Sequence, residues 1–143
     1  QMEKLNCKGL YAFKEGKIKP FELDDKKTIM CGIPGAFTDG CTKKHLPGFA
    51  RNLDKLKEKG IEKVLFVGNN DVYVMNEWNM QHGSPEITTI SDPLAVFTKS
   101  INKDEDWGDS FGIRTSRYAF LIEKGNIVKE FKNPFIEGVL EEI

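Results

Sequence analysis

Apolar residues recur along the chain in two alternating patterns, short continuous runs and longer stretches with helical spacing. The runs Thr28–Ile33 and Lys63–Val67 are typical of strands buried inside a sheet. Between them, apolar residues at helical intervals predict a helix from about Cys41 to Lys59, which Gly60 ends. Its apolar face consists of Leu46, Phe49, Leu53 and Leu56. We expect a kink at Pro47-Gly48, because proline lacks the backbone N–H that a helix needs.

The other elements follow from the same patterns and from the turn residues between them. We expect a hairpin of Leu10–Phe13 with Lys17–Phe21, a helix from Asn69-Asn70-Asp71 through Asn79, a strand Thr88–Ile90, a helix Leu94–Ser100, a loop Lys103–Asp109, a hairpin of Arg117–Glu123 with Asn126–Phe131, and a helix Phe135–Ile143. This order predicts an α/β sandwich, in which helices flank a mixed central sheet that begins with an N-terminal hairpin. A parallel core with an antiparallel hairpin at one edge is the thioredoxin-like arrangement. We expect one domain over residues 1–143.

Composition and charge narrow the possible partners. Of the 143 residues, 39% are hydrophobic and 30% charged, with a formal net charge of −1, which is typical of an ordinary globular protein. The near-zero charge and the lack of a basic cluster argue against nucleic acid as a partner. No apolar run approaches the ~20 residues of a membrane span, so we expect no membrane partner.

The cysteines and the N-terminus bear on the compartment. Cys7, Cys31 and Cys41 are too few for a disulfide framework and lack metal-ligand spacing, so we expect no metal and no cofactor. Residues Gln1–Leu5 lack the pattern of a signal peptide. We therefore expect a cytoplasmic protein, or an organellar one if a targeting segment precedes this sequence.

Cys41 lies where a strand ends, a loop turns and a helix begins. The first turn of a helix presents unpaired N–H groups, and these groups together with the helix dipole favour a negative charge. A thiol in such a position tends to ionise, and the thiolate is the nucleophilic form of cysteine. Cys41 is therefore the leading candidate for chemistry.

Several motifs around Cys41 resemble those of the peroxiredoxins, and within them the peroxiredoxin-5, or type II, subfamily. Pro34-x-x-x-Thr38-x-x-Cys41 matches their P-x-x-x-T-x-x-C signature. The longer matching strings are Gly32-Ile33-Pro34-Gly35-Ala36-Phe37-Thr38, His45-Leu46-Pro47-Gly48-Phe49, Asn70-Asp71-Val72-Tyr73-Val74-Met75, Ser91-Asp92-Pro93 and Arg117-Tyr118-Ala119. The resemblance runs from about residue 28 to residue 128.

The resemblance implies a role for each matching residue. Cys41 is expected to be the peroxidatic cysteine, whose thiolate attacks the O–O bond of a hydroperoxide and becomes a sulfenic acid. Thr38 would hold the thiolate and one peroxide oxygen, and Pro34 would shield the site from water. Arg117 would be the distant arginine that the fold brings onto Cys41. The backbone N–H groups of Gly40 and Cys41 would act as further donors.

Each assignment has an alternative explanation in the sequence alone. Cys41 could be an inert buried thiol, Thr38 could merely cap the helix, and Pro34 could simply end the strand. Arg117 could form a surface ion pair, and Arg114 lies three residues away as a rival.

His45 lies one helical turn beyond Cys41. It could act as a base, but an ionised thiol needs none, so we expect His45 to lie in a second layer around the site or at its rim.

The sulfenic acid must be reduced, and both known resolving positions of the subfamily are vacant. Phe66 stands where plant type II members carry a resolving cysteine, and no cysteine follows Cys41. Cys31 is expected in the core and Cys7 in the N-terminal segment, so neither is our resolving candidate. The expected mechanism therefore uses one cysteine and an external thiol, glutathione with glutaredoxin first and thioredoxin second.

Other functions and the assembly state stay open at this point. A peroxide sensor or redox-regulated binding protein would use the same cysteine, whereas a general thiol–disulfide oxidoreductase is disfavoured by the absence of a C-x-x-C motif. The resemblance implies a homodimer formed through loops around the active site. Phe37, Phe49 and Trp78 are possible contacts, unless they belong to the core.

Overall fold

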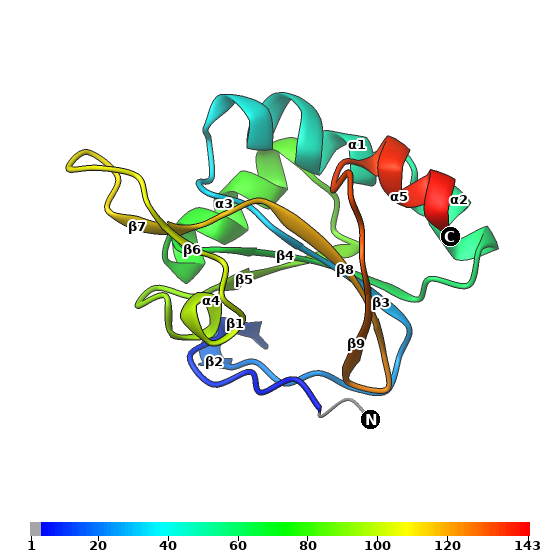
Figure 1. The fold of residues 1–143 in the computed structure, drawn as a ribbon, viewed down its shortest axis with the longest axis horizontal. Coiled ribbons are helices and arrows are strands. Elements are labelled where there is room, and N and C mark those ends of the chain that lie inside the picture. Colours follow the sequence, from blue (N-terminus) through cyan, green and yellow to red (C-terminus); the bar gives the residue numbers. More distant parts are fainter. Residues whose placement is uncertain (1–3) are drawn as a thin grey trace.

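The computed structural model describes residues 4–143, and residues 1–3, on which part of the targeting expectation rests, lie outside the described part. Its main feature is a seven-stranded sheet in the order β2-β1-β5-β4-β3-β8-β9 (Figure 1). The strands are β1 (Tyr11–Lys14), β2 (Lys17–Pro20), β3 (Thr28–Gly32), β4 (Lys63–Gly68), β5 (Ile87–Ser91), β8 (Tyr118–Glu123) and β9 (Asn126–Glu130). A separate pair joins β6 (Asp104–Asp106) and β7 (Ile113–Thr115).

The sheet is mixed, as the sequence predicts. Strands β3, β4 and β5 are parallel, and antiparallel strands extend the sheet at both edges rather than at one. Cys31 of β3 lies beside Phe66 of β4 and Ala119 of β8, so β3 is fully enclosed by neighbours. All five residues of β3 are buried, which explains the unbroken apolar run in its sequence.

Helices cover both faces of the sheet. They are η1 (Cys41–His45), α1 (Leu46–Ala50), α2 (Leu53–Glu58), α3 (Val72–His82), α4 (Val96–Ser100) and α5 (Ile136–Glu142). Residues Ile29 and Cys31 of β3 share a core with the segment from η1 to α2 and with α3 and α5. The opposite side of β3, at Met30, packs with Phe97 of α4. Figure 1 shows the resulting layers, with α4 on the other side of the sheet from α1, α2 and α5.

The predicted helix 41–59 is interrupted, and a break that the sequence does not predict separates α1 from α2. The chain starts with the π-helical segment η1, in which the N–H of Leu46 bonds to the carbonyl of Cys41. Pro47, which follows, cannot donate to the carbonyl four residues earlier, so a regular α-helix cannot run through this point. A further break falls at Arg51-Asn52, between α1 and α2, where the Asn52 side chain donates to the carbonyl of Gly48 at 2.7 Å.

Three further expectations need correction. Helix α3 begins after the predicted cap Asp71, whose carboxylate accepts from the N–H of Val74, but it continues to His82. Helix α4 begins at Val96 rather than Leu94, because Ala95 precedes it with a left-handed backbone (φ 57°). The predicted loop 103–109 contains β6, whose acidic sequence gives no strand signal and whose pairing with β7 holds it. Figure 1 shows this β6–β7 hairpin projecting beyond the sheet in yellow.

Within residues 4–143, no helix is both long enough and apolar enough to cross a membrane.

Candidate active site

Cys41 is the first residue of η1 and is fully buried. Gly40 before it already has helical dihedral angles (φ −64°, ψ −37°), so Cys41 lies in the first turn of a helical segment. Within residues 4–143, the N–H groups of Gly40 and Cys41 bond to no acceptor outside the helix. The thiol therefore lies among backbone N–H groups that can stabilise a negative charge.

Arg117 is the side chain that reaches the thiol. It directly precedes β8, and the pairing of Tyr118 with Gly32 places it beside the end of β3. Its Nη2 donates to the Sγ of Cys41 at 3.2 Å. A Cβ atom on Gly40 would lie 3.1 Å from Nη2, so the glycine leaves the space that the guanidinium needs.

Arg114, the other candidate arginine, bonds to different residues than Arg117 does. Arg114 Nη1 donates to the carbonyl of Pro34 at 2.9 Å, and its Nε donates to the carbonyl of Phe111 at 3.1 Å. Arg114 therefore links the turn after β3 to the β6–β7 hairpin. Of the two arginines, only Arg117 bonds to Cys41 within the described residues, and it forms no ion pair there with a carboxylate.

His45 lies behind Arg117 and not at the rim. Its Nδ1 is 2.8 Å from Arg117 Nη1, and its Nε2 is 3.0 Å from the carbonyl oxygen of Pro134. Since a carbonyl only accepts, Nε2 carries the proton and Nδ1 accepts from the arginine. Burial, followed by the charge of Arg117, lowers the pKa of His45 to about 3, so this histidine is neutral at physiological pH.

The remaining predicted residues gather in the turn between β3 and η1. Pro34 is buried, and Thr38 is half-buried. The Thr38 hydroxyl donates to the carbonyl of Gly35 at 2.6 Å, and the Thr38 carbonyl accepts from the N–H of Thr42 at 2.9 Å. The structure shows no hydrogen bond from Thr38 to the thiol of Cys41, so its predicted contact with the thiolate stays a prediction.

The two other cysteines differ from Cys41 in setting. Cys31 is free and fully buried in β3, on the face that also packs against Cys41. Burial raises the pKa of the Cys31 thiol well above its usual range, against the opposing effect of Arg117, so this thiol stays protonated. Cys7 is free and half-buried on the other face of the sheet.

Two residues near the site had no signal in the sequence. The carbonyl of Pro134 bonds to His45, and the Phe135 ring lies with its centroid 5.1 Å from the guanidinium carbon of Arg117. We expected only a helix at residues 135–143. Sequence spacing could not reveal these contacts, because they join positions 89 and 18 residues apart through the tertiary fold.

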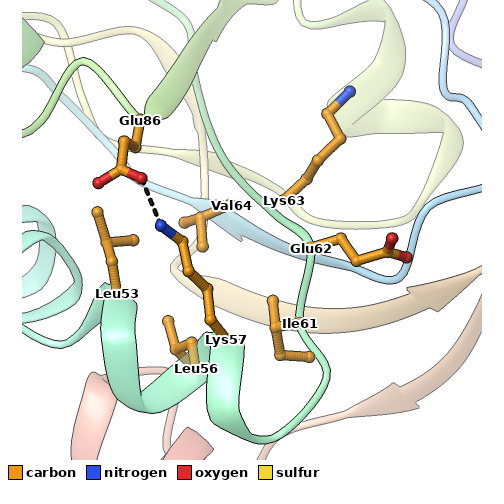
Figure 2. Close-up of a pocket in the computed structure, with 8 residues that line it drawn as sticks. All are labelled: Leu53, Leu56, Lys57, Ile61, Glu62, Lys63, Val64 and Glu86. Atoms are coloured by element: carbon orange, nitrogen blue, oxygen red, sulfur yellow. Dashed lines mark hydrogen bonds and ion pairs between the residues drawn. The ribbon is translucent and has the colours of Figure 1, made fainter.

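Other sites in the molecule are less suited to chemistry. Within residues 4–143, no cluster of three or more acidic, histidine or cysteine side chains could hold a metal ion. A small cavity of about 60 Å³ lies beside α2. Figure 2 shows the side chains that line it, among them the ion pair of Lys57 and Glu86. The lining of this cavity includes none of the residues around Cys41, so we do not assign the chemistry to it.

Comparison with known proteins identifies the family of the chain. The redoxin family model matches residues 13–143. Peroxiredoxin Pen c 3 of Penicillium citrinum is 38% identical over 109 residues, which cover 75% of this chain and 62% of the relative. The crystal structure of reduced Prx3 from Vibrio vulnificus in complex with H₂O₂ has a TM-score of 0.92 at 28% identity, covering 99% of this chain and 96% of that chain.

A third similar protein is the Plasmodium falciparum antioxidant protein, described as a 1-Cys peroxiredoxin. Its crystal structure has a TM-score of 0.77 at 30% identity and covers 82% of this chain and 78% of that chain. The chain therefore belongs to the redoxin family and, within it, to the peroxiredoxins. It spans about three fifths of the length of the Penicillium relative.

Proposed function

We propose that this protein is a thiol-dependent peroxidase that reduces hydrogen peroxide and small alkyl hydroperoxides at Cys41. The observation that carries the proposal is the 3.2 Å contact between Arg117 Nη2 and the Sγ of Cys41, a buried residue in the first turn of a helical segment. A fixed guanidinium beside a thiol favours the thiolate and stabilises charge that develops on a peroxide oxygen. The H₂O₂ bound to the similar Vibrio protein supports the proposed substrate.

The proposed reaction is a displacement at oxygen. The Cys41 thiolate attacks one peroxide oxygen, an S–O bond forms, and the O–O bond breaks. The electron pair leaves on the second oxygen, which takes a proton and departs as water or an alcohol, and Cys41 becomes a sulfenic acid. In this proposal Arg117 and the N–H groups of Gly40 and Cys41 donate to the oxygens, Thr38 orients the peroxide, and Pro34 excludes water.

We further propose that the reductant is an external thiol. It attacks the sulfur of the sulfenic acid, water leaves, and a mixed disulfide with Cys41 forms; a second thiol then displaces the Cys41 thiolate. The buried, protonated state of Cys31 and the position of Cys7 on the opposite face support this route. So does the similarity to a protein described as a 1-Cys peroxiredoxin. Glutathione with glutaredoxin is the first choice and thioredoxin the second.

The test is steady-state peroxide turnover with the glutathione/glutaredoxin and thioredoxin systems in parallel. We expect Cys41→Ser to abolish turnover, and Thr38→Val and Arg117→Met each to lower it by about 10²-fold or more. Turnover that survives in Cys41→Ser would overturn the assignment. Slow peroxide reaction with long-lived oxidation of Cys41 would instead favour the sensor or redox-regulated binding protein.

A homodimer is the proposed assembly, and Phe37 is its best-supported contact. Phe49 and Trp78, the other two candidates, are fully buried core residues and cannot form a surface contact. Phe37 has a left-handed backbone (φ 65°), is 46% exposed and contacts the ring of His82 within the monomer. A bulky residue in this conformation is strained, and much of its surface stays in solvent, so both features support a partner at this loop.

The cytoplasm is the proposed compartment. Three free cysteines without a disulfide support a reducing environment. Relatives named for the chloroplast and the peroxisome make an organelle the alternative. Fractionation of cells that express the native gene would decide between the two.

A further inference from the structure

A continuous chain of contacts connects the C-terminal turn to the thiol of Cys41. The carbonyl oxygen of Pro134 accepts from His45 Nε2 at 3.0 Å. On the other side of the imidazole, His45 Nδ1 accepts from Arg117 Nη1 at 2.8 Å. Arg117 Nη2 in turn donates to the Cys41 Sγ at 3.2 Å. The two terminal nitrogens of the guanidinium therefore have different partners, and this fixes the rotation of the planar group.

Phe135 restrains the same guanidinium from a third direction. The guanidinium carbon of Arg117 lies 5.1 Å from the centroid of the Phe135 ring, within the range of a cation–π contact. The ring also lies 5.0 Å from the imidazole of His45 and 4.3 Å from the Nζ of Lys44. Its backbone is anchored by a hydrogen bond from the N–H of Phe135 to the side chain of Asn133 at 3.0 Å.

We propose that His45, Pro134 and Phe135 form a clamp that positions Arg117 against Cys41, and that His45 acts as a hydrogen-bond acceptor within it rather than as a base. The inference rests on the proposed peroxidase function of Cys41. It assigns to the turn at residues 133–135 a role in the chemistry of a thiol more than 90 positions earlier in the chain.

The chemistry of His45 explains why a histidine serves this place. A neutral imidazole offers one donor and one acceptor on opposite sides of a rigid ring, which matches a carbonyl on one side and a guanidinium on the other. A protonated ring would have no acceptor and would bring a second positive charge onto Arg117 and Lys44. Burial of His45 among the side chains of Phe49, Phe66 and Phe135 disfavours the charged form of the imidazole as well.

The proposal predicts that the acceptor matters, not merely the filled volume. His45→Gln keeps an amide oxygen that can accept from Arg117, whereas His45→Leu fills the space without an acceptor. Phe135→Leu removes the ring that faces the guanidinium. Phe131→Leu is the matched control, because it removes a buried ring from the same C-terminal region without a contact to Arg117.

Two readouts follow each variant after thermal unfolding has shown that it folds. The first is the second-order rate constant for oxidation of reduced protein by H₂O₂. It is followed by intrinsic tryptophan fluorescence, since one of the two tryptophans, Trp78, bonds through its indole to Thr42 beside Cys41 at 3.0 Å. The second is the rate constant for alkylation of Cys41 by iodoacetamide at neutral pH, in a Cys7→Ser background. Alkylation reports the influence of Arg117 on the thiol without any peroxide.

We expect His45→Leu to lower the H₂O₂ rate constant about 10- to 100-fold and the alkylation rate constant about three- to tenfold. Phe135→Leu should lower the rate about three- to tenfold. His45→Gln should restore the rate to within about threefold of wild type, and Phe131→Leu should leave both readouts unchanged.

Wild-type values of both rate constants in folded His45→Leu and Phe135→Leu would overturn the clamp, as would a His45→Gln variant that loses as much as His45→Leu. A wild-type protein that does not react with H₂O₂ would refute the proposed function instead. The alkylation rate constants would still decide whether the clamp holds Arg117 against Cys41.

Discussion

His45 gives the site a dependence on pH that can be measured as stability. Its pKa is about 6.5 in an unfolded chain and about 3 in the folded protein, mainly because of burial and then the charge of Arg117. Between these values the unfolded state binds more protons, so the stabilisation is complete above about pH 6.5 and is lost as the pH falls toward 3.

The corresponding measurement is urea unfolding of wild type and His45→Gln at pH 7.5 and pH 4.5. Lowering the pH should cost the wild type about 2 to 3 kcal/mol more than the variant, which has no group to titrate at this position. Equal losses in both proteins would show that His45 is not held neutral by its surroundings.

A substitution at Gly40 is expected to affect the peroxide rate and the stability of the fold in different ways. Its backbone is helical, so alanine is allowed there and should raise the free energy of unfolding by up to about 1 kcal/mol. The added Cβ would lie 3.1 Å from Arg117 Nη2 and would push the guanidinium away from Cys41. We expect Gly40→Ala to lower the peroxide rate about tenfold without loss of stability, in stopped-flow and urea experiments. An unchanged rate would mean that Arg117 has room to spare.

At this scale the sequence could identify the residues but not their contacts. The signature around Cys41 and the block before β8 led to the two side chains that the fold joins at 3.2 Å. The partners of His45 and the ring of Phe135 could not be found, because they depend on where the chain turns at Asn133 and Pro134. No local pattern encodes that position.

At the scale of elements, the strands of the sheet centre were the most predictable. Strands β3 and β4 are buried on both faces, so their composition alone reports their environment. The interrupted helix 41–58 and strand β6 were missed in part. In the helix, the apolar spacing continues across the break at Arg51-Asn52, which the Asn52 side chain stabilises. In strand β6, pairing with β7 outweighs the weak preference of the acidic sequence for a strand.

Arg114 offers a test of how the β6–β7 hairpin is held. Its Nη1 bond to the carbonyl of Pro34 links this hairpin to the turn before Cys41, and its Nε bond to the carbonyl of Phe111 lies within the hairpin. We expect Arg114→Met to raise amide hydrogen exchange at residues 104–115 and 34–38, measured by mass spectrometry, while β3 and β4 keep their protection. Unchanged exchange in both segments would show that the hairpin is held by other contacts.

At the scale of the molecule, assembly is the property least visible in the sequence. Of three aromatic residues considered as dimer contacts, two lie in the core, and only burial in the fold distinguishes them from Phe37. Phe37→Asn suits the left-handed backbone and removes the ring. Light scattering should show a dimer for wild type and for the control Val128→Thr on β9, and a shift toward monomer for Phe37→Asn. A dimer that persists in Phe37→Asn would place the interface elsewhere.

Neither of the two known resolving positions holds a cysteine in this sequence, and for this reason we propose an external reductant. Phe66 fills its place in β4 as a fully buried ring against His45 and Trp78, so no thiol can act from there. Cys31 shares the core around Cys41, however, and an internal disulfide between them is the direct competitor of an external reductant.

Mass spectrometry of the reduced protein after one equivalent of H₂O₂, with dimedone as the trapping reagent, tests the central claim most directly. The account predicts a dimedone adduct on Cys41, which marks a sulfenic acid, with Cys7 and Cys31 left as free thiols. An intramolecular disulfide between Cys41 and either of the other cysteines, or a Cys41 that remains reduced, would contradict it.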